Sequence, residues 1–173
     1  LVALDSYGNY WAVEKKDFYF KKCFVFNGQK FTTVTFDSIN IKNNYLRNFY
    51  IGKNGNIWIS PSFNGVHQYK LDNQTKKLIY INKYLPEGID VYDIYEDESG
   101  ILWLGTYNDG LIRLDPATKK FTTYTTKEGM PSNFIFKLIP YGKKIFIISD
   151  LGTAFFDIES KTIRVSKELD EYI

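Results

Sequence analysis

The chain has 173 residues, and its 44% hydrophobic content is enough for the core of one domain. Its 22 basic and 20 acidic residues are interspersed, so no basic stripe indicates nucleic acid as a partner. No apolar stretch approaches the roughly 18 residues of a membrane span, and Cys23 has no second cysteine to pair with. We therefore expect no membrane contact by this segment and no internal disulfide.

Residues 1–36 predict a first set of short strands. Leu1 to Asp5 is typical of a strand end, Tyr10 to Glu14 of a second strand, and residues 23–27 and 31–36 of two more. We expect a long connection over residues 15–22, where four lysines surround Phe18, Tyr19 and Phe20. Two interpretations of this connection stay open. One is a basic, aromatic arm that binds an acidic glycan, and the other, which we favour, is a solvated loop.

The same pattern returns over residues 46–81, 91–125 and 134–165, most clearly in the third copy. There Ser99 to Phe121 reads S-G-I-L-W-L-G-T-Y-N-D-G-L-I-R-L-D-P-A-T-K-K-F, which is three strand signals separated by two turns. Residues at matching positions, 47, 45 and 43 apart, are Trp11, Trp58, Trp103 and Phe146. The predicted strand that follows the tryptophan strand ends each time in an amide or acid, at Asn27, Asp72, Asp115 and Asp157.

A period in the low to mid forties with about four strands per unit is typical of a propeller blade. We therefore predict an all-β chain, a β-propeller segment over residues 1–173 with blades at about 1–36, 46–81, 91–125 and 134–165. Propellers close with roughly four to eight blades, so four blades form either a small ring or an arc. Both ends fall inside the pattern, which favours an arc whose partners are further blades or a second copy of the chain.

Several motifs favour structural roles over chemical ones. The repeated Trp residues suit packing between blades better than carbohydrate stacking, because a ligand platform rarely repeats in register. Asp97 to Gly100 suits a tight turn better than a calcium loop, because it lacks spaced oxygen ligands. His67 is the single histidine and has no nucleophile assigned to it, so we predict no catalytic residue, metal ligand or cofactor.

Ligands tend to bind where loops converge on a rigid scaffold. In a propeller, the loops between second and third strands share one face with the links between blades. Aromatic faces with amide and carboxylate partners suit a sugar, and this face carries both. The candidate ligand-binding residues are Arg47, Phe63, Asn64, Asp90, Tyr92, Tyr107, Asn108, Asp109, Asn133 and Phe134.

The third copy resembles the two-component regulator propeller repeat. It fits the repeat pattern in register from Ile94 to Tyr124, and residues 129–133 are similar to the link between blades. The second copy departs from the pattern at Ser60, and the fourth has lost its Trp. The resemblance implies a periplasmic sensor segment of an inner-membrane histidine kinase, often a hybrid kinase–regulator, with the kinase module elsewhere. Many such sensors respond to oligosaccharides.

Two functions therefore stay open, with an enzyme as a distant third. The first is a sensor that binds an oligosaccharide and signals by conformational change or association. The alternative is a protein-interaction scaffold without a small ligand. A propeller lyase or hydrolase lacks support, since no histidine pair or carboxylate constellation stands out.

Overall fold

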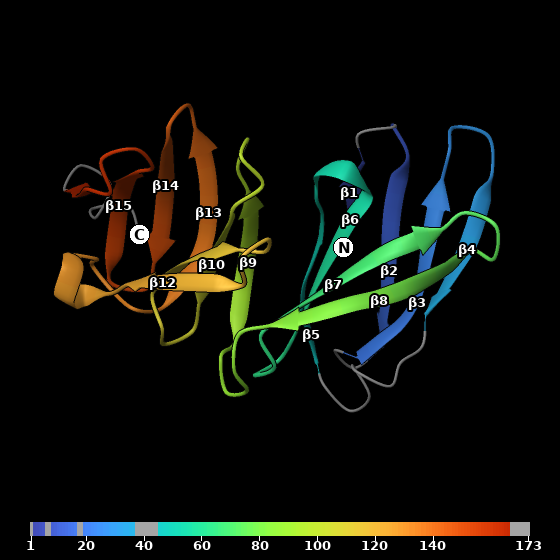
Figure 1. The fold of residues 1–173 in the computed structure, drawn as a ribbon, viewed down its shortest axis with the longest axis horizontal. Helices are drawn as coiled ribbons and strands as arrows, with labels where there is room; N and C mark the ends of the chain where they lie inside the picture. Colours follow the sequence, from blue (N-terminus) through green and yellow to red (C-terminus); the bar gives the residue numbers. More distant parts are fainter. Residues whose placement is uncertain (1, 6–7, 17–18, 37–44, 167–173) are drawn as a thin grey trace. The chain divides into compact units, whose positions relative to one another are not determined.

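The fold is that of a computed structural model, which describes residues 2–5, 8–16, 19–36 and 45–166 (Figure 1). Regular structure in these residues is all β-strand, apart from the single 3-10 turns η2 (Lys53–Gly55) and η3 (Thr126–Glu128). The all-β prediction is confirmed. The chain forms two compact units, Leu1–Gly88 and Ile89–Ile173.

The first unit contains two sets of four consecutive antiparallel strands. Its strands are β1 (Val2–Leu4), β2 (Tyr10–Lys16), β3 (Tyr19–Phe26), β4 (Phe31–Phe36), β5 (Leu46–Ile51), β6 (Asn56–Pro61), β7 (Val66–Asp72) and β8 (Lys77–Tyr84). The last strands of the two sets, β4 and β8, pair in parallel at Thr35–Lys77 and Phe36–Leu78. The two sets are therefore continuous in one eight-stranded sheet, which the repeat pattern does not predict.

One predicted connection in this unit is wrong. Residues 15–22 were expected to link two strands, but β2 continues to Lys16 and β3 begins at Tyr19. Lys15 pairs with Phe20 and Lys16 with Tyr19. The backbone ladder of the hairpin continues past the register shift between Glu14 and Lys15, so the hairpin extends although the adjacent pairs of lysines give no alternating pattern. Residues 17 and 18, like 37–44 and the tail 167–173, lie outside the described residues.

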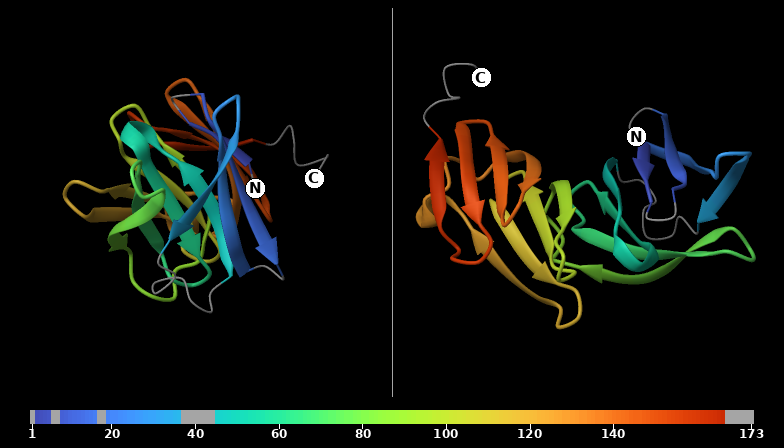
Figure 2. Two further views of the ribbon diagram at one scale, coloured as in Figure 1. Left: turned by 90° about the vertical axis from the view of Figure 1, so that its right-hand side faces the viewer. Right: turned by 90° about the horizontal axis from the view of Figure 1, so that it is seen from above.

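The second unit contains two separate four-stranded antiparallel sheets (Figures 1 and 2). One runs β9 (Val91–Glu96), β10 (Leu102–Thr106), β11 (Leu111–Asp115) and β12 (Lys120–Tyr124), and the other β13 (Ile135–Tyr141), β14 (Lys144–Ser149), β15 (Gly152–Asp157) and β16 (Ile163–Ser166). Each sheet is a simple meander in which neighbours in sequence are neighbours in space. In both figures the orange and red strands of the second sheet lie against the yellow strands of the first.

The repeated tryptophans are buried, as predicted: Trp11, Trp58 and Trp103 are 3%, 1% and 0% exposed. Trp11 packs in a core shared by the two halves of the first unit, with its ring 6.1 Å from that of Phe49. Trp103 packs in the corresponding core of the second unit, 5.0 Å from the ring of Phe156. Large flat side chains thus fill the space between facing sheets, where burial stabilises them most.

Three acidic positions of the repeat hold the turns. Asp72 and Asp115 each accept a hydrogen bond from the backbone N–H two residues on, at 2.8 and 2.9 Å. The hydroxyls of Thr75 and Thr118 donate to the same carboxylates, and these bonds lower the pKa of both groups. Asp157 does the same through the Glu159 N–H at 3.1 Å. The predicted structural role of these carboxylates is confirmed.

Asp97 likewise forms a tight turn. Its Oδ1 accepts the N–H groups of Ser99 and Ile101 at 2.9 and 3.1 Å, and its Oδ2 accepts the Trp103 indole N–H at 2.9 Å. In the first blade Asp5 makes the same bond to Trp11, also at 2.9 Å. The carboxylate therefore ties the turn to the buried ring, and its oxygens are engaged by protein donors.

Candidate functional site

Three predicted site residues of the second unit form one aromatic cluster. Tyr92 is the second residue of β9, Tyr107 lies in the β10–β11 loop and Phe134 directly precedes β13. The Tyr107 ring lies 4.6 Å from that of Phe134, and the Tyr92 ring lies 5.1 Å from Phe134 and 6.1 Å from Tyr107. Strand ends and loops that are distant in sequence thus converge here.

Phe136 is a fourth member that the sequence analysis missed. Its ring lies 4.3 Å from that of Phe134, and it is 43% exposed, while Tyr107 is 38% exposed. Alternation along β13 could have found it, since residues two apart share a face of a strand. We call Tyr92, Tyr107, Phe134 and Phe136 the aromatic cluster. Two of its rings offer a large part of their surface to solvent.

Backbone hydrogen bonds fix the loops that carry the aromatic cluster. The Tyr107 N–H donates to the Asp90 carbonyl at 3.0 Å, and the Gly110 N–H donates to the Asn133 carbonyl at 3.0 Å. Gly110 has a φ of +71°, and a Cβ there would lie 2.2 Å from the Tyr124 carbonyl oxygen. Only glycine fits this position, so the β10–β11 loop is held closely against the link to β13.

The polar candidates of this unit divide into two groups. Asp90 is 1% exposed, and the Asn133 side-chain oxygen accepts the Thr126 N–H at 2.9 Å, so both support the loops. Asn108 is exposed and Asp109 half-buried on the loop that carries Tyr107. These last two are the polar side chains best placed to meet a ligand beside the aromatic cluster.

A buried carboxylate that the sequence analysis missed joins the strands beneath the cluster. Asp93 is 4% exposed, and its oxygens accept the Leu138 N–H at 2.8 Å and the Lys137 ammonium at 2.9 Å. Asp93 lies on β9 and its donors on β13, so it sets the position of Phe134 and Phe136 relative to Tyr92. Ion pairs of this kind position elements more clearly than they stabilise them.

The first unit holds the other candidates, Arg47, Phe63 and Asn64. The Arg47 guanidinium carbon lies 6.0 Å from the Phe63 ring centroid, a cation–π contact. Phe63 is 52% exposed in a left-handed conformation, φ +53°, and its carbonyl accepts the Gly88 N–H at 2.8 Å. The Asn64 side-chain oxygen accepts a hydrogen bond from Lys83.

His67 lies next to these residues but faces inward. It is 1% exposed, and its Nε2 lies 3.1 Å from the Asn64 carbonyl oxygen. Burial lowers the pKa of His67 from 6.5 to about 4. The ring is therefore neutral at physiological pH and supports the Asn64 turn.

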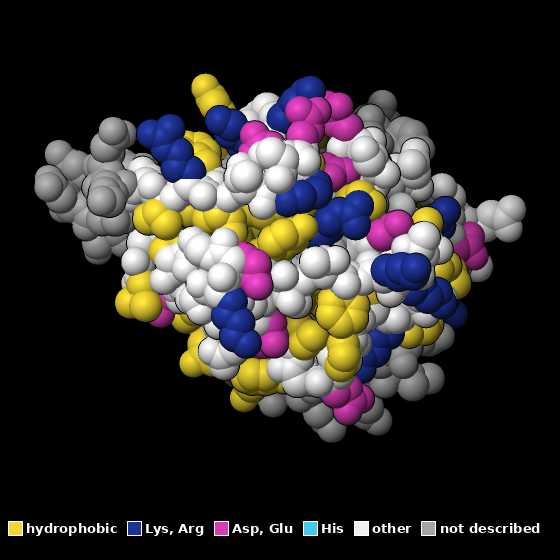
Figure 3. Space-filling view, turned by 60° about the vertical axis from the view of Figure 1, so that its left-hand side comes forward, with side chains coloured by type: hydrophobic (Ala, Val, Ile, Leu, Met, Phe, Trp, Pro, Cys, Tyr) yellow, Lys and Arg dark blue, Asp and Glu magenta, His cyan; other side chains and the backbone are white. Residues whose placement is uncertain are grey.

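The described part of the chain shows neither a candidate metal site nor, on the face drawn in Figure 3, a patch of one charge. No group of three or more His, Cys, Asp or Glu side chains there could hold a metal ion, and no described helix is long and apolar enough to cross a membrane. Figure 3 brings the left-hand side of Figure 1 forward, and shows small hydrophobic groups among basic and acidic side chains. Neither sign of charge dominates that face.

Comparison with solved structures defines the class of protein: the chain has the fold of a β-propeller segment. The extracellular domains of two proteins described as hybrid two-component systems from B. thetaiotaomicron superpose with TM-scores of 0.67 and 0.69, at 22% and 20% identity. The matches cover 96% and 97% of this chain but 24% and 25% of theirs, so the chain spans about a quarter of their length. The predicted propeller is confirmed.

One segment of the sequence matches a repeat family. Residues 84–108 match the family described as two component regulator propeller, which confirms the resemblance. YCF48 from Cyanidioschyzon merolae is a further structural neighbour, with a TM-score of 0.66, 15% identity and coverage of 89% of this chain and 48% of its own. YCF48 has also been solved bound to D1 peptide. No curated protein matches the sequence.

Proposed function

We propose that this chain is a ligand-sensing segment of the periplasmic propeller of a two-component sensor histidine kinase. The ligand is an oligosaccharide, and the segment binds it without catalysing a reaction. The match to the two component regulator propeller family supports the signalling context. One structural observation carries the ligand proposal: the partly exposed aromatic cluster at the loop end of the second unit.

The chemistry of the cluster suits a sugar. The C–H faces of a pyranose ring pack against aromatic rings, and the quadrupole of the ring adds to the apolar contact. Tyr107 and Phe136 offer such faces, and Asn108 and Asp109 offer hydrogen-bonding groups beside them. The loops are held by backbone bonds, so little conformational freedom is lost when a ligand binds.

Titration calorimetry with a panel of oligosaccharides tests this proposal. The panel contains cellohexaose, xylohexaose, maltohexaose and an acidic galacturonide. We expect one member to bind and Tyr107→Ala to weaken it about tenfold, the equivalent of about 1.4 kcal/mol. Tyr141→Ala is the matched control, because Tyr141 is 72% exposed but lies at the other end of β13. Equal effects of the two variants would contradict the assignment.

A protein-interaction scaffold is the second candidate. The supporting observation is that YCF48, which shares the propeller fold, has been solved with a bound peptide. If no oligosaccharide in the panel binds, a display library of unstructured peptides screened against the chain, with Tyr107→Ala as counter-selection, tests this alternative. Peptides retained by the original chain and lost by the variant would favour the scaffold.

A further inference from the structure

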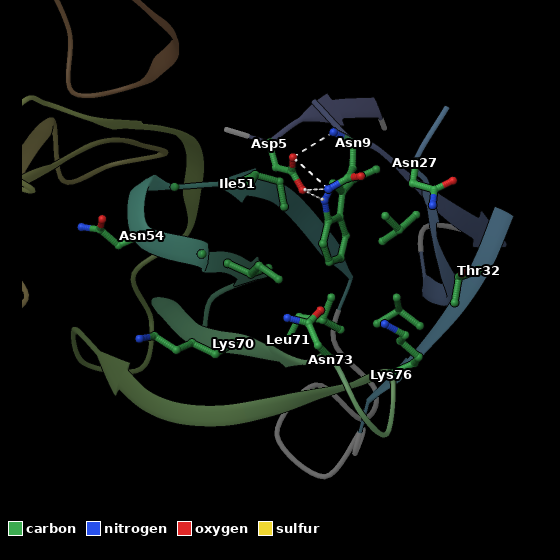
Figure 4. A pocket seen from close by; sticks show the side chains of 16 residues that line it. Asp5, Asn9, Asn27, Thr32, Ile51, Asn54, Lys70, Leu71, Asn73 and Lys76 are labelled. Atoms are coloured by element: carbon green, nitrogen blue, oxygen red, sulfur yellow. Dashed lines mark hydrogen bonds between the residues drawn. The ribbon is translucent and has the colours of Figure 1, made fainter. Parts of the chain in front are cut away.

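A cleft of about 430 Å3 lies in the first unit, at the opposite end of β6 and β7 from Phe63 and Asn64 (Figure 4). It is bounded by the hairpin turns of β1–β2, β3–β4, β5–β6 and β7–β8. Its volume falls in the range of small-molecule sites, about 300–1,000 Å3. Residues of both sets of strands in the unit line it, with Trp11 among them.

The second unit fills the corresponding place. The position of Trp11 is taken there by Trp103, and the Trp103 ring is covered by Phe156 at 5.0 Å and Tyr124 at 6.4 Å. Ile158 packs against the same core, and the Lys161 ammonium lies 5.4 Å from the Trp103 ring centroid. Aromatic and aliphatic side chains therefore leave little space beside this tryptophan.

The two units differ at three matched positions. Strand register and the shared Asp–x–x–Thr/Ser–Lys turn align Tyr124 with Val34, Phe156 with Leu71, and Ile158 with Asn73. Val34, Leu71 and Asn73 all line the cleft. Two large rings have become small aliphatic side chains and one aliphatic side chain has become an amide. The cleft thus exists because of specific substitutions within one repeat pattern.

The polar lining of the cleft is basic. Among the described lining residues Asp5 supplies the single carboxylate, which accepts hydrogen bonds from the Asn9 backbone N–H at 2.9 Å and the Trp11 indole N–H at 2.9 Å. Lys70 and Lys76 supply two positive charges, and neither forms a salt bridge within the described residues. In Figure 4, Asn73 and Lys76 lie across the cleft from Asp5 and Asn9.

We propose that this cleft binds a small organic anion, a carboxylate carried on an apolar body. The carboxylate meets the Lys76 ammonium and the Asn73 amide, which are donors of the kind that recognise carboxylates. The apolar body lies against the half-buried Leu71, Ile51 and Val25, where it removes apolar surface from water. This site is separate from the aromatic cluster and does not depend on the proposed function.

The test uses phenylacetate as the probe and its neutral isostere phenylacetamide as the comparison. Each tryptophan gives one indole N–H signal in a proton–nitrogen NMR spectrum, assigned by Trp→Phe substitution. We expect phenylacetate to shift the Trp11 signal saturably, with a dissociation constant on the order of 1 mM, and to leave Trp103 unchanged. Phenylacetamide should bind about tenfold more weakly, since it loses the charge-assisted bond.

Three variants decide the assignment. Lys76→Met should remove the preference for the anion, whereas Lys161→Met, its counterpart in the second unit, should leave phenylacetate affinity unchanged. Asn73→Ile introduces the residue found in the second unit and should abolish binding. An unchanged signal of Trp58, which is buried in the same unit as Asn73, shows that this variant is folded. No saturable Trp11 shift, equal binding of acid and amide, or full affinity in Asn73→Ile would each overturn the proposal.

Discussion

Gly52 replaces the aspartate that binds the tryptophan indole in two of the other blades. In the first and third blades an aspartate six residues before the tryptophan accepts its indole N–H, at 2.9 Å in both. Gly52 occupies that position before Trp58. The Trp58 Nε1 is buried and has no hydrogen-bond partner among the residues that the structure describes. A buried donor left unsatisfied in this way costs about 1–3 kcal/mol.

Gly52→Asp should therefore stabilise the chain. Gly52 has φ −87°, which an aspartate adopts freely, and its N–H donates to the Asn56 carbonyl at 2.8 Å, as Asp97 donates to Ile101. We expect a gain of about 1 kcal/mol in the free energy of unfolding, measured by urea titration. The same substitution in a Trp58→Phe background gives the control, since it keeps the loss of glycine flexibility and removes the bond. An equal gain in both backgrounds would contradict the explanation.

His67 provides a second residue-scale test, because it is the single histidine. Its pKa is lowered by burial to about 4 in the folded chain, against about 6.5 in the unfolded chain. Between these values the unfolded chain binds a proton that the folded chain does not, so stability falls as the pH falls from about 6.5 to about 4.

The expected loss over this window is about 3 kcal/mol, which urea titrations at several pH values would measure. In His67→Gln the slope between about pH 5 and 6.5 should disappear. Acid sensitivity below about pH 5 should remain in that variant, because hydrogen bonds lower the pKa of Asp72, Asp115, Asp157 and Glu128. A slope that persists between about pH 5 and 6.5 without His67 would show that another group titrates there.

At the scale of elements, the strands were predictable wherever the signal is local. The turn from Asp115 to Lys119 combines a capping carboxylate with a left-handed Lys119, φ +59°, and its counterparts at Lys76 and Lys161 have φ +55° and +58°. Short sequence motifs predict such turns, and the alternation of apolar and polar side chains predicts the strands between them. The burial of Trp11, Trp58 and Trp103 followed from their register in the repeat.

Pairing between distant segments was not predictable. The parallel contact of β4 with β8 joins two edge strands, and edge pairing depends on tertiary placement more than on the residues of either strand. The continuation of β2 and β3 through Lys15 and Tyr19 was hidden for a related reason. Two adjacent pairs of lysines flank residues 18–20, and this lack of alternation is typical of a loop, so the sequence does not predict the hairpin pairing.

The candidate site shows the same division. Strand order alone places Tyr92, Tyr107 and Phe134 at one end of their sheets, and their rings are in contact. Sequence could not show that Asp90 is buried or that the Asn133 amide holds the Thr126 backbone, because both depend on loop geometry. The sequence could not predict the role of the buried Asp93 either, since its partners lie 44 and 45 residues away on β13.

At the scale of the whole molecule, one sheet presents an apolar face with no cover among the described residues. On the outer side of β13–β16, Tyr141 and Ile139 are 72% and 43% exposed. The register places Phe146 and Phe155 in the same cross-strand row as Ile139. Tyr141, Phe155 and Val165 also line a shallow hollow of about 680 Å3 on that sheet. Faces of this kind in propellers pack against a neighbouring blade.

We expect the isolated chain to self-associate through this face. Hiding about 400 Å2 of apolar surface is worth about 10 kcal/mol, against an association cost of about 4–15 kcal/mol, so the complex is weak and concentration-dependent. Light scattering over a dilution series should show the mass rise with concentration, and Ile139→Asp, on the outer face, should shift the midpoint at least about tenfold. Leu151→Asp is the control, because Leu151 is 74% exposed on the β14–β15 turn. A monomer at every concentration would show that the face is satisfied within one chain, and an effect of Leu151→Asp alone would place the contact at the loops.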